Sequence, residues 1–77
     1  MTTSAEQKQA FVKKLEAVLK AAMLSIREVE FIVHANPVGM PDEFVVITME
    51  RGNQRYINVN YNSLLGILID VVGSLKY

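Results

Sequence analysis

The chain has 77 residues, no cysteine, one histidine and eight acidic against eight basic residues, so its net charge is zero. The lack of cysteine excludes disulfides and thiolate zinc sites, and the zero net charge argues against nucleic-acid binding, which usually needs a basic excess to neutralise phosphates. A domain this small buries only about 60% of its unfolded surface, so with 51% hydrophobic residues we expect it to associate with a second chain.

Two stretches of the sequence bear on the cellular location of the protein. The polar start, MTTSAEQKQ, lacks the basic and then apolar layout of a secretory signal. The most apolar run, residues 64–75, contains Asp70 and is twelve residues long, whereas a membrane span needs about 20. We therefore expect one α+β domain over residues 1–77, in the cytoplasm and without membrane association.

A helix is predicted for the first third of the chain. Thr3 or Ser4 can cap it, with Glu6 or Gln7 three residues later to complete a capping box. Apolar residues then recur at spacings of three and four and form one stripe. These residues are Phe11, Val12, Leu15, Val18, Leu19, Ala22 and Met23.

Two strands are predicted next, joined by the loop NPVGMPD. In residues 25–35 a period of two places Val29, Phe31 and Val33 on the core face. The opposite face carries Glu28, Glu30, Ile32 and His34. Residues 43–50, EFVVITME, show almost no alternation, which is typical of a strand covered on both faces.

A hairpin is predicted between residues 43–50 and residues 55–61. A two-residue turn at Gly52-Asn53 would set Thr48 opposite Ile57 and Val46 opposite Val59. The reverse face would then hold Val45, Ile47, Met49, Tyr56, Asn58 and Asn60.

A register one residue different would reverse that assignment. In that case the core would gain Val45, Ile47 and Met49 beside Ile57 and Val59, and Phe44 and Val46 would lie outside.

The last helix follows a cap at Asn62 or Ser63. The predicted fold is therefore α+β, in the order α-β-β-β-α, with a three-stranded antiparallel meander and both helices on one face. This order and the stretch GMPDEF resemble the double-stranded RNA-binding domain. The lysine cluster that opens the last helix in that family is replaced here by NSLLGILID, so the resemblance implies a topology only.

More apolar surface is predicted than one chain can cover. The last helix has an inner stripe, for which we expect contact with the sheet, and a second stripe of Leu65, Ile69 and Val72. Either the first helix covers this second stripe or a second copy of the chain does. The reverse sheet face gathers Ile32, Val45, Ile47, Met49 and Tyr56, with His34, Asn58 and Asn60 as candidate ligand-binding residues around them.

No catalytic constellation is predicted. His34 is the single conventional general base, and no hydroxyl stands in a nucleophile elbow. Glu28, Glu30 and His34 share a strand face, which suits a solvated surface better than a metal site. We expect no cofactor and no metal.

The functional expectation is a non-enzymatic module that self-associates as a homodimer and binds a protein partner through the sheet face or the last helix. The alternatives are a nucleic-acid-associated factor of the RNA-binding topology, and a small ligand-binding protein or enzyme that uses His34 with Tyr56 and Asn58.

Overall fold

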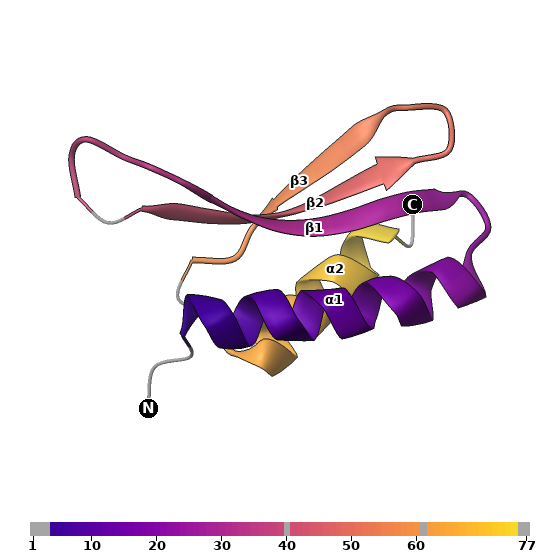
Figure 1. Cartoon of the computed structure of the whole chain (residues 1–77), viewed down its shortest axis with the longest axis horizontal. Coiled ribbons are helices and arrows are strands. Elements are labelled where there is room, and N and C mark those ends of the chain that lie inside the picture. The colour runs from indigo at the N-terminus through magenta and orange to yellow at the C-terminus, as the bar shows by residue number, and fades with distance from the viewer. Residues whose placement is uncertain (1–3, 40, 61, 76–77) are drawn as a thin grey trace.

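The computed structural model describes residues 4–39, 41–60 and 62–75. The elements follow in the order α1 (Ala5–Ala22), β1 (Ile26–His34), β2 (Asp42–Met49), β3 (Gln54–Asn58) and α2 (Leu64–Leu75). The strands form one antiparallel sheet with β2 in the centre, and both helices lie against the same face of it (Figure 1). The predicted α+β fold and its element order are confirmed.

Helix α1 begins at a capping box. The Ser4 hydroxyl accepts a hydrogen bond from the Gln7 N–H, and the Gln7 side chain accepts one from the Ser4 N–H, so two otherwise unpaired donors of the first turn are satisfied. Thr3, the other predicted cap, lies outside the described residues. The buried side of α1 carries Lys8, Val12, Leu15 and Leu19.

Strand β1 pairs with β2 along most of its length, with a bulge at Arg27 that adds one residue to β1. Val29 is buried and Phe31 is partly buried against the core, as the alternation predicts. Val33, which the same alternation places in the core, is half exposed near the end of the strand.

The turn between β2 and β3 differs from the predicted two-residue turn. The Met49 N–H donates to the Asn53 carbonyl at 2.8 Å, and the Gly52 N–H donates to the Met49 carbonyl at 2.9 Å. The loop therefore consists of Glu50, Arg51 and Gly52, and Gly52 has a φ of +93°. A three-residue hairpin loop needs a left-handed residue at its third position, which glycine adopts without strain.

This loop shifts the hairpin by three residues, so the predicted register is wrong. Val46 lies opposite Tyr56 rather than Val59, and Thr48 lies opposite Gln54 rather than Ile57. Because side chains alternate along a strand, an odd shift exchanges the two faces.

Three residues predicted for the reverse face accordingly lie on the helix side. Val45 and Ile47 are fully buried in the core, and Met49 packs against it. The alternative register gave the correct faces, although the shift is three residues rather than one.

The side of the sheet turned away from the helices is called the open face below. By register it consists of Glu28, Glu30, Ile32 and His34 of β1, Asp42, Phe44, Val46 and Thr48 of β2, and Gln54, Tyr56 and Asn58 of β3.

Helix α2 is capped by Ser63, whose hydroxyl accepts a hydrogen bond from the Gly66 N–H at 3.1 Å. Its inner side places Ile67 and Val71 in the core, where both are fully buried. One apolar core therefore joins α1, the helix-side positions of the sheet and one side of α2.

An ion pair joins α1 to the sheet at the edge of this core. Lys8 is only 2% exposed, and its ammonium donates to Glu43 Oε1 and to the Val59 carbonyl at 3.2 Å. The Asn60 side chain accepts from the Glu43 N–H and donates to Asp42 Oδ1. A buried ammonium needs such partners because burial removes its water.

Candidate interaction surfaces

The outer stripe of α2, defined as Leu65, Ile69 and Val72, lies exposed on the molecule. Leu65 is 64%, Ile69 60% and Val72 43% exposed. Scattered exposed apolar residues are ordinary, but three neighbours on one helix face form a contiguous patch of the kind that marks an interaction site.

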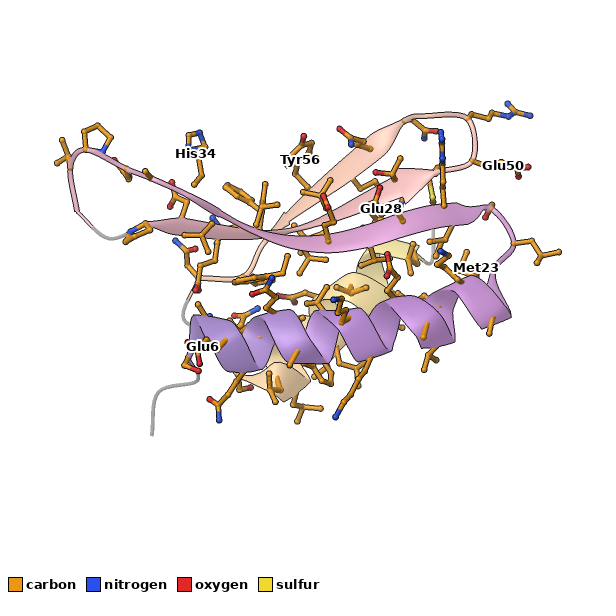
Figure 2. The ribbon with its side chains drawn as sticks, viewed as in Figure 1. Glu6, Met23, Glu28, His34, Glu50 and Tyr56 are labelled. Carbon is orange, nitrogen blue, oxygen red and sulfur yellow. The ribbon has the colours of Figure 1, made fainter. Side chains whose placement is uncertain are left out.

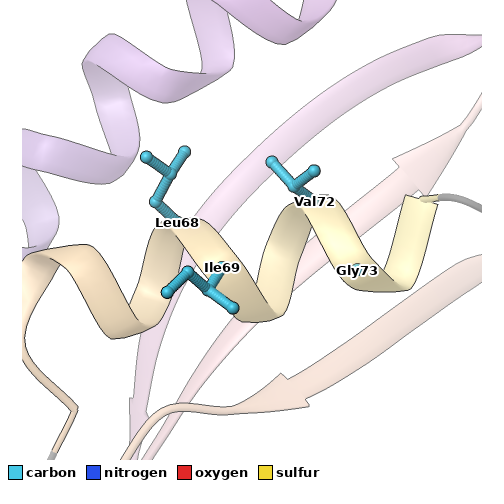
Figure 3. Close-up of a pocket in the computed structure, with 4 residues that line it drawn as sticks. All are labelled: Leu68, Ile69, Val72 and Gly73. Atoms are coloured by element: carbon cyan, nitrogen blue, oxygen red, sulfur yellow. The ribbon is translucent and has the colours of Figure 1, made fainter.

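An open hollow of about 440 Å³ overlaps this stripe. Leu68, Ile69, Val72 and Gly73 line it, and Figure 3 shows Leu68 and Val72 on the side of α2 nearer to α1, with Ile69 on the adjoining side. A Cβ atom added to Gly73 would meet nothing within 4 Å. The hollow is therefore apolar and accessible from outside.

Helix α1 leaves the outer stripe uncovered because it is turned toward the edge of the sheet. Glu16 of α1 accepts a hydrogen bond from the Val29 N–H of edge strand β1 at 2.9 Å. Val18, two residues further on, points to the opposite side of α1 and is 63% exposed. The predicted alternative, in which the first helix buries the stripe, is not what the structure shows.

The open face carries an aromatic pair at its centre. Phe44 and Tyr56 meet edge to face, with ring centroids 6.3 Å apart at 80°. Tyr56 is 60% exposed, and its hydroxyl donates to Gln54 Oε1 at 3.1 Å. Tyr56 thus lies where it was predicted to lie, on the side without helices, as does the partly buried Ile32.

Two of the candidate ligand-binding residues, His34 and Asn58, lie at one end of the open face, and the third, Asn60, follows the end of β3. His34 stands opposite Asp42 and both His34 and Asn58 are exposed, while the Asn58 side chain accepts from the Asn60 N–H at 2.9 Å. Asn60 is engaged with Glu43 and Asp42. Within residues 4–39, 41–60 and 62–75, no group of three His, Asp or Glu side chains is placed to hold a metal ion.

Three residues of the open face and one of the core differ from their predicted positions. The two-residue turn places Phe44 and Val46 on the core face, whereas the alternative register leaves them outside, and the predicted loop NPVGMPD includes Asp42. Lys8 was not assigned to the core, although its spacing to Val12, Leu15 and Leu19 places it on the same helix side. The spacing of Lys8 was therefore a signal available in the sequence.

The exposed area of the chain is large for its mass. It totals 5462 Å², whereas a compact 8.6 kDa monomer exposes about 4700 Å². The molecule is also elongated, measuring 37 × 25 × 20 Å along its principal axes.

Neither described helix combines the length and the apolar composition that a bilayer crossing requires. Comparison of the chain with family models, with curated proteins and with solved structures finds no match.

Proposed function

We propose that this protein is a non-enzymatic interaction module that forms a homodimer through the outer stripe of α2. The observation that carries the proposal is the exposure of Leu65, Ile69 and Val72 side by side, next to an apolar hollow, on a helix whose other side is already packed in the core.

The chemistry of α2 favours a second copy as the occupant. A two-fold interface sets the same patch against itself, so any charge in the patch would face its own like charge. Asp70 is the only charged residue between Leu64 and Leu75, and its carboxylate accepts a hydrogen bond from the Asn62 side chain at 2.7 Å. An uncharged apolar stripe is therefore complementary to itself.

The energy of such an interface can be bounded. Burying a complete Leu, Ile or Val side chain contributes about 1.5–3 kcal/mol. The three stripe residues are roughly half to two thirds exposed, so covering them in both protomers contributes roughly 5–10 kcal/mol. Association itself opposes this with at least about 4 kcal/mol. We therefore expect a dimer that dissociates on dilution, with Val18 and the rim of the hollow adding to the contact.

The experiment is sedimentation velocity over a range of micromolar concentrations. The wild type should approach twice the 8.6 kDa mass of one chain as concentration rises, and Ile69→Lys should remain monomeric with the circular dichroism of the wild type. Leu24→Lys is the matched control, because Leu24 is 90% exposed in the turn after α1 and away from the stripe. A monomeric wild type, or equal behaviour of the two variants, would contradict the proposal.

A further inference from the structure

The open face differs from the outer stripe of α2 in its charge. Glu28 and Glu30 are exposed on β1, and Asp42 is half-buried on β2. None of the register positions that form the open face is Lys or Arg; the nearest cation along β1 is Arg27, the additional residue of the bulge. The open face therefore carries three of the eight acidic residues of a chain that has no net charge.

The positive charges lie largely elsewhere in the part of the chain that the structure describes. Lys13, Lys14 and Lys20 are exposed on α1, across the molecule from the open face (Figure 1). Arg55 is on the helix side of β3, where its guanidinium donates to the Ser74 carbonyl of α2. The helix side is mixed in charge, because Glu6, Glu16, Glu43 and Asp70 also lie there; the open face differs in having carboxylates but no Lys or Arg among its own positions.

The centre of the open face offers a surface for apolar and cationic groups. Val46 is buried and stands opposite Tyr56, and Tyr56 leaves more than half of its surface accessible. Figure 2 shows Glu28, His34 and Tyr56 on the same side of the sheet, away from α1. Glu30 of β1 stands in the same row as Tyr56, with Val46 of the central strand between them. A segment that crosses the strands can therefore place a guanidinium or ammonium group at the carboxylates of β1 and lay another group against the tyrosine ring.

Charge decides which occupant fits. A second copy of this face would bring carboxylates opposite carboxylates, and a nucleic acid would bring phosphates against them; both are repulsive. We propose that the open face binds a cationic segment of another protein, one that carries Lys or Arg beside apolar side chains. The inference deepens the proposed function by assigning the module a second surface and the chemistry of its partner.

The test uses two synthetic peptides of equal length with the same apolar residues, one with lysine and the other with glutamate at every polar position. Binding to the full chain is measured by fluorescence anisotropy, and the affected residues are located by backbone amide chemical shifts. The lysine peptide should bind at least about tenfold more tightly than the glutamate peptide, should lose affinity as salt is raised, and should shift the amides around Tyr56.

Two double variants distinguish an effect of the open face from an effect of net charge alone. Glu28→Lys with Glu30→Lys should weaken the lysine peptide at least about tenfold. Glu6→Lys with Glu50→Lys changes the net charge equally at exposed positions outside the face, in α1 and in the hairpin loop (Figure 2), and should weaken it by less than about threefold. Circular dichroism confirms that both variants fold.

Each remaining outcome has a defined meaning. Absence of binding, equal affinity for the two peptides, equal losses in the two double variants, or tighter binding of a short duplex RNA than of the lysine peptide would each overturn this inference. The variant Ile69→Lys tests the two proposals independently. It should abolish dimerisation and leave lysine-peptide affinity unchanged. If the wild type proves monomeric but binds the lysine peptide at the open face, the dimer alone is wrong.

Discussion

Helices α1 and α2 pack on the same side of one sheet, yet polar and apolar residues are distributed differently around the two helices. In α1 the buried positions are spaced along one side, and the exposed positions are mainly Lys, Gln, Glu and Ala. In α2, Asp70 is the single charged residue of twelve. Two of its residues, Ile67 and Val71, are buried, while apolar neighbours remain exposed.

The difference shows which helix surfaces are covered within one chain and which are not. A helix with a single apolar stripe buries that stripe on its own sheet and exposes its other sides to solvent. A helix that is apolar on most sides needs contacts on a second side, and here α1 leans toward β1 and does not supply them. The unmatched surface on α2 is therefore a property of how α1 is anchored as well as of α2 itself.

The largest effect is expected at the inner side of α2. Ile67→Ala removes a fully buried side chain and should lower the free energy of unfolding by about 2–5 kcal/mol. That is a large fraction of the total of about 4–12 kcal/mol for a domain of this length. Ile69→Ala, two residues away on the outer stripe, should lower it by less than about 0.5 kcal/mol.

Urea unfolding followed by circular dichroism, at a concentration low enough to keep the chain monomeric, measures both values. Similar losses in Ile67→Ala and Ile69→Ala would mean that α2 is covered on both sides within one chain, and the contrast between the two helices would disappear.

A smaller effect is expected at the ion pair of α1. Lys8→Met keeps most of the apolar stem but leaves the Glu43 carboxylate and the Val59 carbonyl without their ammonium donor. Because water still reaches the partly exposed Glu43, the free energy of unfolding should fall by about 1–3 kcal/mol.

The double variant Lys8→Met with Glu43→Leu is the control for that prediction. It removes the unpaired carboxylate as well, so it should recover part of the loss, since apolar replacement of a buried pair is often tolerated. A single variant with the stability of the wild type would show that the pair contributes nothing to the docking of α1.

The sequence was sufficient to predict the elements but not the assignment of the sheet faces. Spacing narrowed the capping box to Thr3 or Ser4 and placed Val29 and Phe31 on the core side of β1, although Val33 of the same pattern is half exposed. Strand β2 gave no such guide: Phe44, Val45, Val46 and Ile47 are all apolar, so either face fits the core. Its register depended entirely on the turn.

The predicted turn is wrong because Gly52 is compatible with two loops. Beside Asn53 it suits a two-residue turn, and as a left-handed third residue it suits the three-residue loop that is observed. The outer stripe of α2 was identified from helical spacing, but whether α1 covers it depends on the Glu16 contact with β1, a tertiary contact that no local pattern encodes.

The smallest effects are expected at the helix caps, where the two helices can be compared directly. In α1 the Ser4 and Gln7 pair is reciprocal, and Glu6 and Lys20 complement the helix dipole. In α2, Ser63 bonds the Gly66 N–H, but Gly66 has no side chain to return the bond, and the first and last turns lack complementary charges.

Ser4→Ala should therefore lower the free energy of unfolding by about 1 kcal/mol, and Ser63→Ala by somewhat less. For a domain of this size a loss of 1 kcal/mol corresponds to about 4–8 °C in the thermal midpoint, which calorimetry detects. Ser4→Thr and Ser63→Asp, which keep a capping oxygen, should stay near the wild type. A larger loss for Ser63→Ala than for Ser4→Ala would reverse the comparison, because it would make α2 the helix that depends more on its local signals and less on packing.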